Sequence, residues 1–171
     1  MGMYTGIRFK GIIKEEFAPV INIMMEERLY WDDLYNLFPQ YDFLGQFSEV
    51  DRSTFIPYGS LSYMPDEWEN IPRTENGSYD YANATDTDGF ERKFDTETRQ
   101  WSFQCSLKNY ESTIQRFFEI VLPEITEKIL HLEYYYEESI RSTFYDLVDG
   151  KVVKSDREGI KYQLDESDYE W

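Results

Sequence analysis

The sequence predicts an α+β domain in which a mainly antiparallel sheet carries two or three helices packed on one face. Three observations favour this class. Strand-like and helix-like apolar spacings alternate along the 171-residue chain. Two patterns typical of β-hairpins join neighbouring strands. The predicted helices are too few to cover both faces of a parallel sheet. A ferredoxin-like arrangement is one candidate topology.

The first part of the chain predicts a strand followed by two helices. Residues 4–14 alternate apolar and basic side chains, which is a strand pattern. The apolar spacing then changes to three and four residues, which indicates a helix. A break at 31–33 and the apolar residues that follow predict a second, short helix, which ends before Pro39.

The middle of the chain has little regular pattern. Residues 40–75 show no sustained period, although 55–65 fit a short strand. The prolines in that segment restrict the strand to the edge of a sheet, because proline cannot donate a ladder hydrogen bond. Residues 74–89 are rich in Asn, Gly, Ser, Thr, Asp and Tyr, and they predict a long polar loop.

The second half begins with a hairpin and the strongest helix signal. Residues 90–94 and 100–107 flank a polar turn, and Asn109 then provides a helix cap. We expect Pro123 to kink or split that helix near 119–122, because proline lacks the N–H that an interior position needs. The predicted apolar stripe of this helix comprises Ile114, Phe117, Phe118, Val121, Leu122, Ile125 and Ile129.

The last elements are strands. Residues 129–136 alternate with period two, with Leu130 and Leu132 on one face and His131 and Glu133 on the other. A second hairpin pairs 141–148 with 151–155 across Asp149-Gly150, a strong turn signal. We predict one domain over residues 1–157 and a flexible acidic tail over 158–171, which ends in Asp165–Trp171.

Charge is the dominant feature of the composition. The chain has 34 acidic and 17 basic residues, a formal net charge of −17, and no segment is basic. Direct binding to nucleic acid or to an anionic membrane is therefore disfavoured, and a basic protein surface is the partner that this charge would attract. The single cysteine suits a reducing compartment, and no signal core or membrane span is evident. We expect a cytoplasmic protein, in a bacterial or phage-infected cell.

No motif reaches the level of a catalytic signature. His131 is the only histidine, and it lacks a recognisable nucleophile context. Cys105 alternates with aromatic residues, as a buried and inert thiol does. Residues 86–89 resemble part of a calcium loop, but its first ligand position would be Ala84. Phosphate-binding glycine motifs are absent. We predict no catalytic residue, metal ligand or cofactor.

Aromatic and acidic residues together indicate a protein-binding surface. The function that we expect is therefore a non-enzymatic acidic interaction protein, such as a phage or mobile-element inhibitor that occupies the nucleic-acid groove of a defence enzyme, or an immunity protein. Two alternatives stay open. One is that the aromatic rings simply complete the core, and the other is a small enzyme or ligand-binding domain with an aromatic-lined pocket around His131. The predicted partner-binding residues are Trp31, Asp32, Asp33, Tyr58, Tyr63, Trp68, Asp86 and Asp88.

Overall fold

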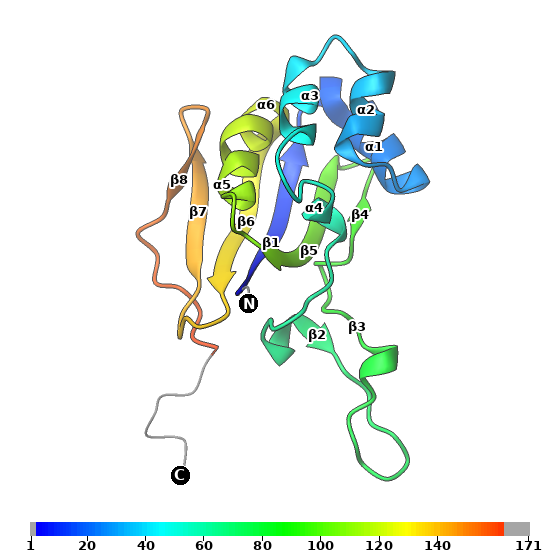
Figure 1. Cartoon of the computed structure of the whole chain (residues 1–171), viewed down its shortest axis with the longest axis vertical. Helices are drawn as coiled ribbons and strands as arrows, with labels where there is room; N and C mark the ends of the chain where they lie inside the picture. The colour runs from blue at the N-terminus through cyan, green and yellow to red at the C-terminus, as the bar shows by residue number, and fades with distance from the viewer. Residues whose placement is uncertain (1–2, 163–171) are drawn as a thin grey trace.

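A computed structural model describes residues 3–162 (Figure 1) and contains a six-stranded antiparallel sheet in the order β4-β5-β1-β6-β7-β8. The predicted α+β class with a mainly antiparallel sheet is confirmed. The strands are β1 Tyr4–Ile13, β4 Lys93–Phe94, β5 Gln100–Lys108, β6 Thr126–Tyr136, β7 Thr143–Val148 and β8 Lys151–Lys154, and a separate pair is formed by β2 Glu69–Asn70 and β3 Thr85–Asp86. The α-helices are α1 Ala18–Glu27, α2 Trp31–Leu37, α3 Asp42–Ser48, α4 Phe55–Tyr58, α5 Thr113–Arg116 and α6 Leu122–Ile125.

The central strands have the ferredoxin-like order. Helices lie in the connection from β1 to β4 and in the connection from β5 to β6, and the spatial order is β4-β5-β1-β6. The β7–β8 hairpin extends the sheet beyond β6, with Asp149 and Gly150 at φ 51° and φ 75° in its turn. Two successive positive φ values are what a tight hairpin turn requires, so the predicted turn is confirmed.

The main core lies between one face of the sheet and the helices. Figure 1 shows α1–α3 and α5–α6 grouped around one end and one side of the central strands. Alternate residues of β1 and β5 lie in this core, which confirms the predicted alternation on 100–107. On 129–136 the prediction holds at Leu132 but fails at Leu130, which is exposed. Among its fully buried residues are Ile7, Phe9, Trp31, Leu34, Leu44, Trp101, Phe103, Cys105, Ile114, Phe117, Val121, Leu122, Ile125 and Leu132.

The opposite face of the sheet is also covered, although not by long helices. Segments from 60–90 and from 155–162 lie over it, and they bring Met64, Trp68 and Tyr162 against Tyr135 of β6. The approach is close: a Cβ on Gly6 would meet the Met64 sulfur at 2.2 Å. A glycine is therefore required at this position of β1, and Ser102, Gln104 and Ser106 on β5 are buried beneath the covering segments.

Several local predictions differ from the structure. Residues 42–48 form α3, a helix missed within a segment that had no sustained period, because seven residues are too short to establish one. Residues 55–65 are not a strand: the Ile56 carbonyl accepts from the Trp31 indole at 2.7 Å, and the Ser60 carbonyl from the Ser106 hydroxyl at 2.6 Å. These bonds hold the segment as the short helix α4 and the loop that follows it.

The predictions for the helix after β5 and for the end of the domain are correct in part. The Asn109 side-chain oxygen accepts a hydrogen bond from the backbone N–H of Ile114 at 2.9 Å. A π-helical stretch at 117–121 interrupts the helix before Pro123, close to the predicted kink. Ile129 belongs to β6 and not to the helix. Residues 158–162 pack on the sheet, with the Ser142 N–H donating to Ile160 at 2.9 Å, so the predicted flexible tail begins too early. Its remainder, 163–171, lies outside the described residues.

Candidate functional site

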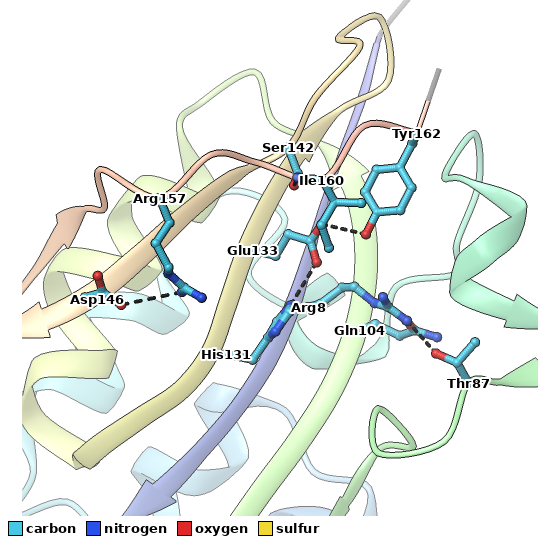
Figure 2. A network of polar contacts seen from close by, with 10 residues as sticks. All are labelled: Arg8, Thr87, Gln104, His131, Glu133, Ser142, Asp146, Arg157, Ile160 and Tyr162. Carbon is cyan, nitrogen blue, oxygen red and sulfur yellow. Dashed lines mark hydrogen bonds and ion pairs between the residues drawn. The ribbon is translucent and has the colours of Figure 1, made fainter. Parts of the chain in front are cut away.

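A buried polar network crosses the sheet on the face opposite the helices (Figure 2). In the strand register, Arg8 of β1 is paired with Gln104 of β5 on one side and with Glu133 of β6 on the other. All three side chains are buried. Burying a polar or charged group is costly unless it is hydrogen-bonded, and each of these groups has hydrogen-bond partners.

Glu133 is the centre of the network on β6. Its side chain is 0% exposed, and its carboxylate accepts from His131 Nε2 at 2.8 Å and from the Tyr162 hydroxyl at 2.6 Å. Burial alone raises the pKa of this carboxyl, but hydrogen bonds from His131, Tyr162 and Ser142 outweigh it, so the pKa of Glu133 is lowered. Tyr162 responds in the opposite direction: burial, together with its bond to Glu133, raises its pKa.

Arg8 connects the sheet to the segment that carries β3. Its Nε donates to the Gln104 side-chain oxygen at 2.9 Å, and its Nη2 donates to the Thr87 hydroxyl. The Gln104 amide then donates to Asp86 Oδ1 and to the Trp68 carbonyl, both at 2.7 Å. The guanidinium also lies over the Phe90 ring, 3.9 Å from its centroid. The buried network therefore fixes the position of residues 86–90.

An open acidic cleft lies beside this segment. It has a volume of about 680 Å³ and is lined by residues 58–61, 69–70, 84–86 and 88, together with 91–92 and Gln104. The lining includes one guanidinium, that of Arg92, and four carboxylates, those of Glu69, Asp86, Asp88 and Glu91. Burial, and then the charges of Asp86 and Asp66, raise the pKa of Glu69. The cleft therefore holds an excess of negative charge.

Tyr58 forms the aromatic wall of the cleft. Its hydroxyl donates to the backbone carbonyls of Met24 and Leu29 at 3.0 and 2.8 Å, which ties this wall to the end of α1. Burial raises the pKa of Tyr58 to about 12, so the hydroxyl keeps its proton at neutral pH. The guanidinium of Arg92 lies 5.1 Å from the centroid of the ring. Tyr58 thus presents a rigid ring beside four carboxylates.

A tyrosine-bearing arm extends from the cleft. Residues 71–84, which we call the arm, project away from the sheet between β2 and β3 (Figure 1). Tyr79 and Tyr81 are 50% and 60% exposed, with ring centroids 5.8 Å apart. Arg73 lies over the Tyr79 ring at 3.9 Å and donates to the Gly77 carbonyl at 2.8 Å. The arm therefore offers ordered aromatic surface next to the acidic cleft.

Three of the predicted partner-binding residues come together in this region. Tyr58, Asp86 and Asp88 all line the cleft. Tyr63 does not line it; it is 71% exposed and stacks on Tyr4 with a centroid separation of 5.2 Å. Sequence reasoning missed Glu69, Glu91 and Gln104, and the only available signal was the polar alternation of the strand that contains Gln104.

The other predicted residues are placed differently. Trp31 and Trp68 are 1% and 0% exposed, so the prediction that they anchor a partner is wrong. Trp31 packs in the main core, and Trp68 packs between the 60–90 segment and Tyr135 of the sheet, where large rings fill the space between layers. Asp33 accepts the backbone N–H of Tyr30 at 3.0 Å and so caps α2, while Asp32 is exposed at the same helix start.

The two residue types most often used in catalysis, the cysteine and the histidine, lie in apolar surroundings. Cys105 is buried, and burial raises the pKa of its thiol. The His131 ring contacts the Phe90 and Phe144 rings, at centroid distances of 4.9 and 5.3 Å. Within residues 3–162, no group of three or more His, Cys, Asp or Glu side chains is arranged to hold a metal ion. Asp86 and Asp88 thus line a cleft without converging on a metal position.

No protein-family model, curated protein or solved structure matches this chain. The arguments for function therefore rest on the geometry of the cleft, the arm and the buried network. In the part of the chain that the structure describes, every helix is too short or too polar to cross a membrane.

Proposed function

We propose that this chain is a non-enzymatic interaction protein that binds a basic protein surface through the acidic cleft and the adjoining arm. The observation that carries the proposal is the cleft itself, where Glu69, Asp86, Asp88 and Glu91 lie beside the ring of Tyr58. Lysine and arginine side chains suit such a site, because carboxylates pair with their charge and aromatic rings pack against them.

Charge and aromatic surface would have separate roles in binding. A net charge of −17 attracts a basic partner over a distance and speeds encounter at low salt. Attraction of this kind changes the association rate more than the lifetime of a complex. Residence time would come from the exposed rings of Tyr79 and Tyr81 on the arm, since buried aromatic anchors contribute most of the binding energy at many interfaces.

The finer proposal concerns the kind of partner. Proteins with basic grooves for nucleic acid are natural targets for a carboxylate-rich surface, so we propose an inhibitor of phage or mobile-element type that occupies such a groove. An immunity protein that neutralises a basic toxin would use the same chemistry. Competition separates the two: an inhibitor of the first kind is displaced from its partner by nucleic acid, whereas an immunity protein bound outside a nucleic-acid site is not.

The cleft can be tested with a defined probe, an eight-residue oligolysine peptide, by NMR titration of the labelled protein. We expect the largest amide shifts at 58–61, 69–70 and 84–92. The double variant E69Q/D88N should weaken binding several-fold more than E26Q/E27Q, which removes two exposed carboxylates from α1 and leaves the same net charge. Equal losses in the two variants, or shifts spread evenly over the acidic surface, would contradict a role for the cleft.

The enzyme alternative is favoured by one observation, the orientation of His131 by a buried carboxylate. An ionised Glu133 can only accept, so Nε2 of His131 carries the proton and Nδ1 is left as the basic nitrogen. This is the arrangement of a general base. However, the acidic cleft of about 680 Å³ does not include His131 in its lining, and the ring neighbours of this histidine are phenylalanines. Binding is therefore the better-supported function.

A further inference from the structure

A second, smaller cavity has the opposite electrostatic character. Its volume is about 260 Å³, and it lies where residues 52–60 pass over the end of the β1–β5 ladder. Two cations, Arg52 and Lys108, line it together with Tyr4, Phe55 and Leu107. No carboxylate belongs to this lining, which sets the cavity apart from the acidic cleft.

Cations are the minority charge in this chain, in which acidic residues outnumber basic ones by 34 to 17. Four other lysine or arginine side chains in residues 3–162 form ion pairs, whereas Arg52 and Lys108, like several others, form none with a described carboxylate. Their neighbours are aromatic: Arg52 lies 5.0 Å from the Tyr110 ring centroid and Lys108 lies 5.7 Å from that of Tyr4. Both charges are therefore available to a bound anion.

Separate elements hold the two cations at the cavity. Lys108 is the last residue of β5 and is paired with Tyr4 at the start of β1. Arg52 lies in the turn between α3 and α4 with φ 65°, a left-handed conformation that is uncommon for residues other than glycine. The N–H of Phe55 donates to the Arg52 carbonyl at 3.0 Å, which closes this turn. The backbone thus directs an arginine to a position where glycine would fit more easily.

We propose that this cavity binds a small organic carboxylate with an aromatic or aliphatic body. The cations would pair with the carboxylate, and arginine can do so through two parallel hydrogen bonds. Tyr4, Phe55 and Leu107 would contact the apolar body, in the usual pattern of a mostly apolar pocket with a few placed polar groups. The site is independent of the proposed partner binding, since the two cavities share only Ser60.

An NMR titration with benzoate tests the proposal, with benzyl alcohol and benzylamine as probes of similar size and different charge. We expect benzoate to shift the amides of 52–55 and 106–108 in a saturable manner, and the other two probes to produce weaker effects. R52Q/K108Q should bind benzoate roughly ten-fold more weakly, because a charge-assisted interaction is removed at each position. K151Q/K154Q is the control, since it changes the net charge equally on the exposed strand β8.

Three results would overturn the proposal: no saturable shifts at these amides with benzoate at tens of millimolar, equal responses to benzoate and benzyl alcohol, or equal losses in R52Q/K108Q and K151Q/K154Q. Should the double variant lose its folded spectrum, K108Q alone provides the same comparison, because Lys108 lies at the end of a strand and forms no described ion pair. Unchanged benzoate affinity in folded K108Q and in folded R52Q would equally exclude the site.

Discussion

Replacing Glu133 with glutamine should show how strongly the buried network stabilises the fold. The change keeps the size of the side chain and removes its charge. Three hydrogen bonds to the carboxylate are affected, those from His131, Tyr162 and Ser142. The cross-strand neighbour Arg8 also loses a nearby opposite charge. Hydrogen bonds to charged groups contribute about 1.5–3 kcal/mol each. Arg8 and Glu133 form no ion pair within residues 3–162, so the hydrogen bonds set the scale, and we expect a loss of about 1.5–3 kcal/mol.

The assay is urea unfolding at equilibrium, followed by tyrosine and tryptophan fluorescence and extrapolated to zero denaturant. The pH dependence supplies a second readout. Because the pKa of Glu133 is lower in the fold than its ordinary value of 4.5, its contribution is present above that value and is lost as pH falls through the folded pKa. The difference between wild type and E133Q should therefore be full at pH 7 and should shrink below about pH 4.5.

A double-mutant cycle isolates the interaction energy between Arg8 and Glu133. If Arg8 and Glu133 interact, R8M/E133Q should be less destabilised than the sum of the two single variants, by more than about 0.5 kcal/mol. A loss below about 1 kcal/mol for E133Q, or a difference that does not change with pH, would refute the role that we assign to this carboxylate.

Three further predictions concern the core, the hairpin and the cleft. Phe118→Ala should lower the free energy of unfolding by about 3–5 kcal/mol in urea denaturation, because its buried ring packs on Tyr145 at 4.9 Å; a loss under about 1 kcal/mol would contradict its place in the core. Gly150→Val should lower the thermal midpoint, because Gly150 has φ 75°, whereas Lys154→Ala should leave it almost unchanged; similar shifts would refute the turn. Glu69→Gln should raise the free energy of unfolding at pH 7, because a carboxyl with a raised pKa destabilises the fold while it is ionised. The gain over wild type should disappear as pH falls and the wild-type carboxyl becomes protonated; a gain that persists in acid would contradict this.

The helix-facing core was the part of the fold that local patterns could predict. Period-two alternation on β5 and β6, the Asp149-Gly150 turn and the cap at Asn109 all depend on residues close together in the chain. Leu130 shows where such reasoning ends: it was predicted to share a face with Leu132, yet it is exposed beside a register shift between β1 and β6. A β-bulge of this kind depends on the partner strand, which local spacing does not specify.

The second layer over the sheet could not be predicted in the same way. The contact of Arg8 with Thr87 spans 79 positions, and that of Gln104 with Asp86 spans 18. Thr87 and Asp86 belong to a segment without a periodic pattern, so local spacing gives no sign of these contacts. Without that layer, Trp68 resembles an exposed aromatic residue of a loop, which is why its predicted role was wrong. Asp86 and Asp88 were identified from composition alone, but the cleft that unites them with Glu69 depends on the same long-range contacts.

The most direct test of the proposed function is the association rate with the native partner, captured by pull-down and purified. We predict that the rate falls markedly as salt rises from about 0.01 M to about 0.15 M, because the screening length shortens from roughly 30 Å to 8 Å. At low salt, E69Q/D88N should associate more slowly than E26Q/E27Q, although both carry the same net charge. An association rate that is indifferent to salt and equal in the two variants would contradict binding through the acidic cleft.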